Sequence, residues 1–341
     1  MSIEEYIAAW LSPSKTLEVQ TSGSTGRPKC ITVEKERMRA SARMTCDFLG
    51  LREGQTALLC MSVDYIAGKM MVVRALERGL RLITTAPSGH PLKDIDADID
   101  LAAMVPMQVW NSLQEPTERA QLQRIRHLII GGGAVSPELE EGLHTLYDEQ
   151  CSKGTRPTAV WSTYGMTETL SHIALRRLSG PEATLWYTPL PGISLSQDAE
   201  TQTLIIDAPA LCTDPLHTHD IVHFEDNDSP MHSMPGLRFR ILGRTDNTVC
   251  SGGVKIQIEE VETLLQQHLG DSVQLTSRPD PKFGEVLVLL TTYPINENLL
   301  HHILREHPYW YPKEILYVTA LPRTATGKPD RTTAKHMATN S

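Results

Sequence analysis

Near its start the chain carries a short polar loop whose residue types could hold an anion. TSGSTGRPK occupies residues 21–29 and brings hydroxyl groups, glycines and two cations together. Backbone N–H groups and hydroxyls in such a loop can surround an anion such as phosphate, and the cations can compensate its charge. The alternative is a mobile Gly/Ser linker, which the composition of the loop alone favours. Three further segments bear on this choice.

The second polar segment, STYGMTET at residues 162–169, follows a predicted strand and carries Thr167 and Glu168. We expect it to form a turn from that strand into a helix. A carboxylate at such a turn is ordinarily a partner of the helix dipole. Glu168 by itself therefore does not indicate a site.

The other two segments lie in the C-terminal third of the chain. GRTDNTVCSGGVKI, at residues 243–256, gathers polar residues and glycines where the pattern of elements changes, which is typical of a domain joint. PRTATGKPDR, at residues 322–331, contains Gly327, which permits a tight turn, followed by Lys328. A lysine in a surface loop is usually a solvated charge, so Lys328 in isolation predicts no role.

The elements that must position these segments alternate along the chain. Four apolar runs are typical of strands: residues 57–63, 81–87, 126–133 and 158–165. Residues 68–78 have helical spacing, and Ser136 and Pro137 are typical of the N-cap and first position of another helix. This alternation predicts an α/β sheet with ligand-binding loops at the carboxyl ends of its strands.

After Pro189 the pattern changes to short strands separated by Gly, Pro and Asp turns, which predicts a small β-rich subdomain. Beyond residues 243–248 a mixture of helical and strand patterns predicts a compact α+β unit. We therefore expect an α/β protein with two domains. The large domain covers residues 1–243 and the small C-terminal domain covers residues 244–341.

Composition and charge exclude several classes of protein. Hydrophobic residues make up 40% of the chain, which is too apolar for disorder. A formal net charge of −9 argues against nucleic acid or an anionic membrane as a partner. No segment approaches the ~20 apolar residues that span a bilayer. The N-terminal MSIEEYIAAWL lacks the basic region of a secretory signal and is typical of a short amphipathic helix. With scattered cysteines and no C-x-x-C pair, we expect a cytoplasmic protein.

Taken together, the four polar segments resemble the adenylate-forming superfamily, which contains acyl-CoA synthetases, the adenylation domains of peptide synthetases and luciferase. TSGSTGRPK resembles its phosphate-binding loop and YGMTE its adenylate-binding turn. GRTDNTVCSGGVKIQIEEVE resembles its hinge signature, and PRTATGKPDR its catalytic-lysine motif. The segments occur in the order of the family and span nearly the whole chain, so we set the linker interpretation aside.

The resemblance implies a two-step reaction with ATP, Mg²⁺ and coenzyme A. A carboxylate attacks the α-phosphorus of ATP, which gives an acyl-adenylate and pyrophosphate, and a thiol then displaces AMP. Both reactants of the first step are anions, so charge compensation is its main requirement. One charge pair at ~4 Å and an effective dielectric of ~20 is worth ~4 kcal/mol. That corresponds to roughly a thousandfold in rate.

The resemblance also implies the residues of the nucleotide site. The residues that bind the β- and γ-phosphates belong to the first loop and are Thr21, Ser22, Gly23, Ser24, Thr25, Gly26 and Lys29. Tyr164 lines the adenine pocket, Thr167 meets the α-phosphate and Glu168 ligates Mg²⁺. Asp220 binds the ribose hydroxyls, and Arg244 approaches the same sugar.

Two residues are implied in catalysis and movement. Lys328 bridges the carboxylate and the phosphate in the first step. Asp246 is the hinge about which the small, mobile domain turns between the two steps.

The sequence departs from the family pattern at three places. Cys30 replaces a glycine at the end of the first loop. His219 replaces the glycine before Asp220, where a crowded backbone could weaken the ribose contact. The first loop also begins only about twenty residues into the sequence, whereas most relatives carry a long N-terminal subdomain before it. We therefore expect a truncated large domain whose acyl pocket is completed elsewhere, for instance by a partner subunit in a homo-oligomer.

Among the family, short bacterial chains with these motifs are most similar to o-succinylbenzoate–CoA ligases of menaquinone biosynthesis. The substrate is then a small carboxylic acid. The residues expected to contact it are Tyr65, Lys69, Gly132 and Gly133. Lys69 begins an apolar helix, where it either meets a second carboxylate of the substrate or reaches solvent. Asp64 is the kind of residue with which amino-acid-activating relatives bind an ammonium group, so an amino-acid adenylating enzyme is the alternative.

The sequence also bears on two other functions, AMP-dependent regulation and zinc binding. A regulator that only binds AMP would not need Lys328 or Glu168, both of which are present. HTHDIVH would place His217, His219 and His223 on one face of a strand, which is tolerable geometry for zinc. No fourth ligand is evident and Asp220 lies on the opposite face, so solvated histidines are the preferred interpretation.

Overall fold

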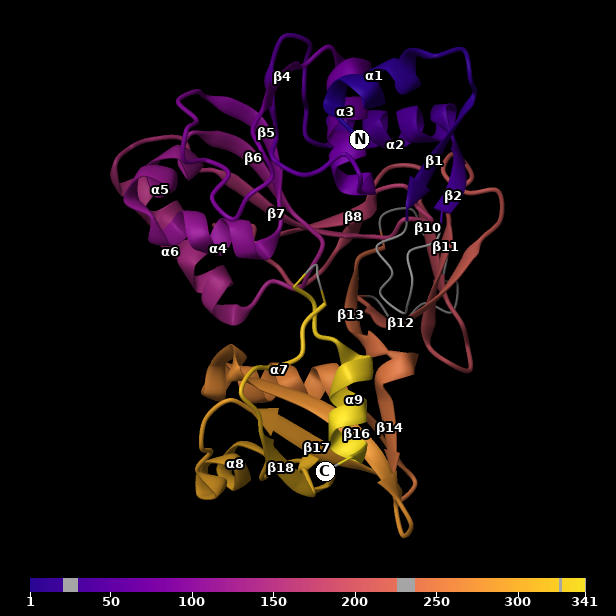
Figure 1. Cartoon of the computed structure of the whole chain (residues 1–341), viewed down its shortest axis with the longest axis vertical. Helices are drawn as coiled ribbons and strands as arrows, with labels where there is room; N and C mark the ends of the chain where they lie inside the picture. The colour runs from indigo at the N-terminus through magenta and orange to yellow at the C-terminus, as the bar shows by residue number, and fades with distance from the viewer. Residues whose placement is uncertain (21–29, 226–236, 325–326, 341) are drawn as a thin grey trace.

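The computed structural model describes residues 1–20, 30–225, 237–324 and 327–340. Two lobes lie along the long axis of the molecule (Figure 1). The upper lobe contains the strands up to β13, and the lower lobe contains β14 to β18. Within the described ranges, no helix combines the length and the apolar character needed to cross a bilayer.

A seven-stranded sheet forms the centre of the upper lobe, in the order β4-β3-β5-β6-β7-β8-β9. Its strands are β3 (Thr56–Leu59), β4 (Arg81–Thr84), β5 (Ile99–Met104), β6 (Ile125–Ile130), β7 (Ala159–Gly165), β8 (His172–Arg177) and β9 (Thr188–Pro189). The strands from β4 to β7 are parallel, whereas β8 and β9 join antiparallel. This mainly parallel sheet confirms the predicted α/β class.

Helices cover both faces of this sheet, because parallel strands connected through helices must be shielded on both sides. On one face the sheet packs with α2 (Lys35–Phe48) and α3 (Ile66–Arg78). On the other it packs with α4 (Pro106–Gln114) and α6 (Pro137–Ser152), and α5 (Pro116–Leu122) adjoins α4. Ser136 caps α6 as predicted, since its side chain accepts a hydrogen bond from the N–H of Leu139.

The prediction of a helix after β7 is wrong. Residues 166–171 form a turn, and the chain then enters β8, which pairs antiparallel with β7. Leu170 has a left-handed φ of 64°, which interrupts any helix, and the hydroxyl of Thr169 closes the turn by bonding to the N–H of Met166. Four consecutive buried residues, His172 to Leu175, then make β8 a core strand. Pairing with β7 outweighs the local helical signals of the segment.

The predicted β-rich subdomain is a four-stranded antiparallel sheet, in the order β10-β11-β12-β13. Its strands are β10 (Ser194–Gln197), β11 (Thr203–Asp207), β12 (Leu216–Phe224) and β13 (Phe239–Arg244). The N-terminal segment is the expected helix, α1 (Ile3–Leu11), with Ser2 and Glu5 forming a capping box. A hairpin of β1 (Thr16–Gln20) and β2 (Cys30–Glu34) follows it.

The lower lobe has a separate hydrophobic core, whose buried members run from Val249 to Leu304. Its strands are β14 (Thr248–Ser251), β15 (Val254–Gln257), β16 (Val273–Asp280), β17 (Gly284–Thr291) and β18 (Glu314–Tyr317). Its helices are α7 (Ile258–Leu269), α8 (Glu297–Ile303) and α9 (Arg331–Thr339), with short 3₁₀ turns at Gly270–Ser272 and Pro308–Trp310. A further 3₁₀ turn, η1 (Thr245–Asn247), connects β13 to β14 between the lobes.

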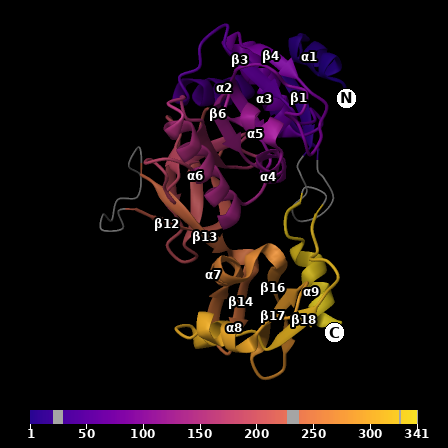
Figure 2. The same ribbon diagram turned by 90° about the vertical axis from the view of Figure 1, so that its left-hand side faces the viewer.

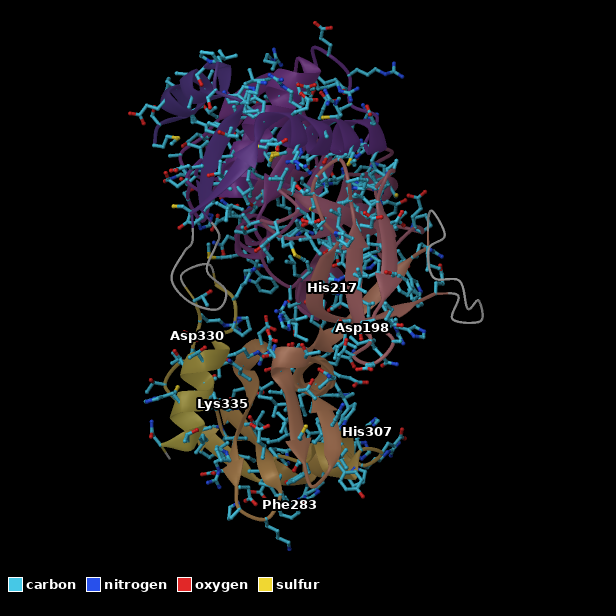
Figure 3. All side chains as sticks on the ribbon, turned by 90° about the vertical axis from the view of Figure 1, so that its right-hand side faces the viewer. Asp198, His217, Phe283, His307, Asp330 and Lys335 are labelled. Atoms are coloured by element: carbon cyan, nitrogen blue, oxygen red, sulfur yellow. The ribbon has the colours of Figure 1, made fainter. Side chains whose placement is uncertain are left out.

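The second view shows α7 and α9 on the side of the lower lobe nearest the upper one (Figure 2). Asp330 caps α9 by accepting from the N–H of Thr333, and it lies where that helix faces the upper lobe (Figure 3). Arg331 forms a salt bridge with Glu262 of α7 at 2.5 Å. These contacts anchor the loop before α9, which contains Lys328, at the junction between the lobes.

Candidate functional site

The predicted phosphate-binding residues Thr21 to Lys29 lie outside the described residues. The strands on either side of them pair antiparallel, and Gln20 is opposite Cys30. The two ends of this loop are therefore held together. The roles assigned to its residues stay predictions.

Asp220 is the centre of a polar cluster formed by three strands. It is 7% exposed and lies on β12. The Tyr164 hydroxyl, from β7, donates to its Oδ2 at 2.6 Å, and Arg244, from β13, donates to its Oδ1 at 2.8 Å. Burial and the neighbouring Asp220 carboxylate raise the pKa of Tyr164, so the phenol keeps its proton and remains a donor. Three predicted nucleotide-site residues thus meet although they are far apart in sequence.

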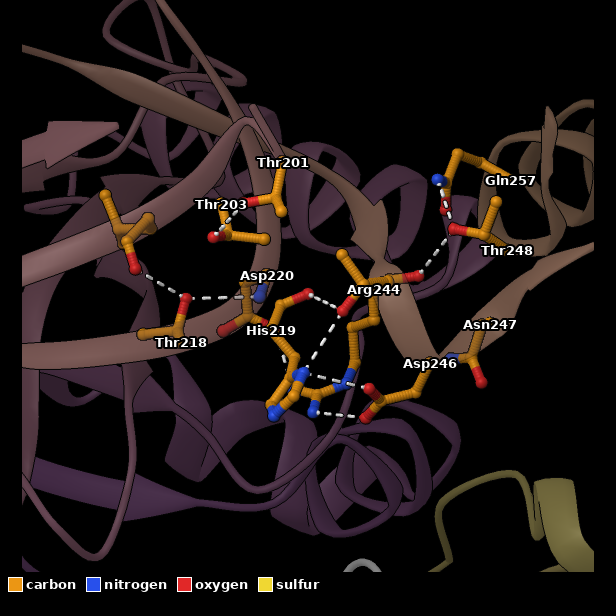
Figure 4. Close-up of polar contacts among 12 residues, drawn as sticks. Thr201, Thr203, Thr218, His219, Asp220, Arg244, Asp246, Asn247, Thr248 and Gln257 are labelled. Atoms are coloured by element: carbon orange, nitrogen blue, oxygen red, sulfur yellow. Dashed lines mark hydrogen bonds and ion pairs between the residues drawn. The ribbon is translucent and has the colours of Figure 1, made fainter. Parts of the chain in front are cut away.

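Arg244 links this cluster to the predicted hinge. Its second guanidinium nitrogen donates to Oδ2 of Asp246 at 2.9 Å (Figure 4). Asp246 lies in η1, the turn that leads from the upper lobe into β14. The same arginine therefore contacts both the predicted ribose-binding aspartate and the predicted hinge.

Lys328 lies near Arg244. Burial lowers the pKa of Lys328, and the positive charge of Arg244 lowers it further. The lysine sits in a tight turn in which Thr324 N–H donates to the Lys328 carbonyl at 2.8 Å. Gly327 in this turn has a φ of 80°, which a residue with a side chain rarely adopts. The predicted catalytic lysine is thus close enough to Arg244 for the charge of that arginine to act on it.

The turn after β7 holds the other two predicted catalytic residues. Thr167 is buried, whereas the Glu168 side chain is exposed. Mg²⁺ is usually held by one or two carboxylates together with substrate phosphates, so a single exposed carboxylate fits that ion. Gly132 and Gly133 follow β6, the neighbouring parallel strand, and Gly132 has a φ of 82°. They lie, as expected, at the carboxyl edge of the sheet.

The expectation that Lys69 reaches solvent is wrong, and its role toward a substrate stays a prediction. Its side chain is 4% exposed, so it does not reach solvent. Its ammonium group donates to the carbonyls of Val63 at 2.6 Å and Asp64 at 3.1 Å and lies over the ring of Tyr6. The group is therefore already engaged by backbone of the loop before α3. Tyr65 is half exposed beside it.

Lys69→Met should lower the free energy of unfolding by about 1–3 kcal/mol, because two carbonyl groups lose a buried charged donor. Urea unfolding measures the change, with Lys93→Met, at an exposed lysine, as the control. The KM for the acid substrate should stay within about twofold. Unchanged stability together with a raised KM would restore the substrate role for Lys69.

Arg74 is a candidate functional residue that was missed in the sequence. It lies in α3 and is only 2% exposed. One guanidinium nitrogen donates to the Ser171 hydroxyl, another contacts the sulfur of Met71 at 3.7 Å, and Nε has no partner among the described residues. Burial lowers the pKa of Arg74 to about 10. The sequence feature that could have identified Arg74 is the presence of an arginine within the apolar run KMMVVRAL.

A buried guanidinium without a carboxylate partner is costly, since its charge has left water without compensation. His172, beside it, offers none: burial and the charge of Arg74 keep its pKa well below the ordinary value, so the imidazole is neutral. Ser171 is the last residue of the turn after β7. Its carbonyl oxygen packs so closely against Gly165 that a Cβ there would lie only 2.4 Å from it. Arg74 is therefore a buried positive charge with no carboxylate partner in the described part of the chain, and it is hydrogen-bonded to the turn that carries Thr167 and Glu168.

The histidines of β12 do not gather around a metal site. His217 and His219 are exposed and lie on the face of the strand opposite Asp220. Throughout the part of the chain that is described, no group of three or more His, Cys, Asp or Glu residues could hold a metal ion. Nδ1 of His219 instead lies 3.0 Å from Oδ1 of Asp246.

The chain belongs to the family of AMP-binding enzymes, whose model matches residues 18–209. This confirms the resemblance to the adenylate-forming superfamily. A solved protein from Dyadobacter fermentans, described as acyl-CoA synthetase (AMP-forming)/AMP-acid ligase II-like, is 34% identical with a TM-score of 0.62; the match covers 98% of this chain and 92% of that one. The chain therefore has the fold of this superfamily.

Two other proteins are more distant. The 2-succinylbenzoate–CoA ligase of Salmonella typhimurium is 26% identical over 311 residues, covering 86% of this chain and 61% of the relative. This chain therefore spans less than two thirds of that relative's length. The o-succinylbenzoate coenzyme A synthetase of Bacillus subtilis, solved with ATP and a magnesium ion, has a TM-score of 0.70 at 21% identity; the match covers 92% of this chain and 68% of that one.

Proposed function

We propose that the protein is an ATP-dependent acid–thiol ligase that forms an acyl-adenylate and then a thioester with coenzyme A. The observation that carries this proposal is the meeting of Tyr164, Asp220 and Arg244, with the charge of Arg244 acting on Lys328. A protein that only bound AMP would have no use for a lysine withdrawn from water beside the nucleotide site. Membership of the AMP-binding family supports ATP as the partner of the acid.

The cluster suits recognition of the nucleotide. Each oxygen of Asp220 accepts one hydrogen bond from the protein and keeps capacity for a ribose hydroxyl. Thr167 is assigned to the α-phosphate, and Glu168 to Mg²⁺, which when bound would neutralise phosphate charge. The first loop is assigned to the β- and γ-phosphates. Lys328 then supplies the positive charge between the attacking carboxylate and the α-phosphate.

Adenylation and thioester formation require different residues around the reacting atoms. A chain divided into two domains can meet this need, because one domain can move relative to the other. We assign residues 1–243 to the domain that binds ATP and acid, and residues 244–341 to a domain that turns about Asp246. The separate core of the lower lobe supports such movement, because the lobe can turn without exposing its interior. We assign the present orientation to the adenylation step, and the action of the Arg244 charge on Lys328 supports this assignment.

For the acid we propose a dicarboxylate of the o-succinylbenzoate class. We assign the second carboxylate of such a substrate to Arg74, whose buried guanidinium has no carboxylate partner among the described residues. The Salmonella relative is named for the same acid. Asp64 gives little support to the amino-acid alternative, because it is exposed and accepts a hydrogen bond from the hydroxyl of Ser62.

Pyrophosphate release should be measured with o-succinylbenzoate, its mono-methyl ester, aliphatic monoacids and amino acids. Arg74→Met should raise the KM for the diacid by about thirtyfold, which corresponds to about 2 kcal/mol, and leave that for ATP nearly unchanged. It should also reduce the preference for the diacid over the ester.

Arg78→Met is the control for this experiment, since Arg78 lies in the same helix and pairs with Asp47 at the surface. Better use of monoacids or amino acids by the wild type would refute the diacid and leave the ligase chemistry standing. No pyrophosphate release with any acid would refute the ligase itself.

A further inference from the structure

His219 connects the upper lobe to the hinge turn through one imidazole ring (Figure 4). Its Nδ1 lies 3.0 Å from Oδ1 of Asp246 and 3.1 Å from the hydroxyl of Thr245. The Thr245 hydroxyl also points back to the His219 carbonyl at 3.5 Å. A glycine at this position, as the family pattern has, would make none of the side-chain contacts.

The histidine does not disturb the ribose-binding aspartate. Its side chain is 66% exposed and lies on the opposite face of β12 from Asp220. Asp220 keeps its contacts with Tyr164 and Arg244. The expected crowding at this position therefore does not occur, and the side chain is directed instead to the hinge.

Asp246 is thereby held through both of its carboxylate oxygens. His219 lies at Oδ1 and Arg244 at Oδ2. The two contacts come from adjacent strands of the upper lobe, β12 and β13, whereas Asp246 belongs to the turn that leads to the lower lobe. A rotation at Asp246 that carried its carboxylate away from these strands would break both.

We infer that His219 is a positioning residue that holds the hinge in the orientation in which Lys328 lies near Arg244. The inference rests on the proposed two-step reaction. Holding this orientation favours adenylation and delays the turn that thioester formation needs. His219 therefore sets the balance between the two half-reactions.

The effect should be modest. Exposed ion pairs are weak, so loss of this contact should change the balance by about two- to fivefold. The imidazole contacts Asp246 and Thr245, both from η1.

The experiment compares His219→Gly and His219→Gln with the wild type. His217→Gln is the matched control, because His217 lies on the same face of the same strand, away from the lower lobe (Figure 3). Two readouts are needed: the ratio of pyrophosphate release to thioester formation from preformed acyl-adenylate, and hydrogen exchange in peptides that cover Thr245–Asn247 without substrate.

His219→Gly should lower the ratio by about two- to fivefold and speed exchange in the hinge turn, whereas His217→Gln should match the wild type. His219→Gln should also lower the ratio, because its amide cannot form an ion pair with Asp246. If His219→Gly showed the same ratio of half-reactions and the same hydrogen exchange as the wild type, the inference would be overturned. If the wild type catalysed neither half-reaction, the proposed function would be refuted. The comparison of hydrogen exchange would still test whether His219 restrains the hinge turn through Asp246.

Discussion

Lys328→Ala should reduce pyrophosphate release by about two to three orders of magnitude. The reason is that the substrate carboxylate and the phosphates repel one another, and this lysine supplies the compensating charge where they meet. Thioester formation from preformed acyl-adenylate and coenzyme A should stay within a few-fold of the wild type, because that step begins after the lobe has turned. The two half-reactions should be assayed separately.

Lys335→Ala is the control for this variant, since Lys335 is a lysine of the same lobe that pairs with Glu285 at the surface (Figure 3). An equal loss in both half-reactions would contradict the assignment of Lys328 to adenylation alone. So would normal pyrophosphate release in Lys328→Ala.

The adenylation step should also have an alkaline limit that Lys328 determines. Burial and the charge of Arg244 lower the pKa of Lys328 below its ordinary value of 10.5. A lowered pKa in a base means that the proton leaves at lower pH, so the charged form is complete below this pKa and is lost as pH rises through it. The rate of pyrophosphate release should therefore decline at a pH below 10.5, and Lys328→Arg should move the decline upward.

Asp246→Pro should separate the two half-reactions by more than about tenfold, because proline fixes φ near −65° and prevents the hinge from exchanging orientations. The half-reaction served by the trapped orientation should persist while the other is largely lost. Each half-reaction is measured under single-turnover conditions, so that slow turning does not mask slow chemistry.

Asp246→Ala is needed beside this variant, because proline also removes the contacts to His219 and Arg244. Alanine removes the same carboxylate yet leaves the backbone free to rotate, so it should change the balance only a few-fold. Near wild-type rates for both half-reactions in Asp246→Pro would place the hinge elsewhere in the chain.

Several features follow from the sequence alone because they depend on neighbouring residues. Alternating apolar runs predicted the α/β sheet, since buried parallel strands and the helices between them have distinct patterns. Ser136 and Pro137 predicted the start of α6, because an N-cap satisfies N–H groups only a few residues away. The four polar segments likewise indicated the nucleotide chemistry, since each is a local loop with its own composition.

Other features were decided by contacts between distant parts of the chain. The segment after β7 has residues suited to a helix but becomes β8, because pairing with β7 satisfies its backbone in the core. The sequence around Lys69 is compatible with a solvated or a substrate-binding lysine. In the fold, its ammonium group donates hydrogen bonds to two carbonyls of the preceding loop.

The site itself also depends on tertiary structure. No local pattern reveals that Arg74 is buried with no carboxylate partner among the described residues, that His219 reaches Asp246, or that the charge of Arg244 acts on Lys328. Burial and charge pairing depend on which surfaces meet when β12, β13 and the loop before α9 come together. A sequence motif can therefore name these residues, but only packing determines which charges are compensated and which remain for a substrate.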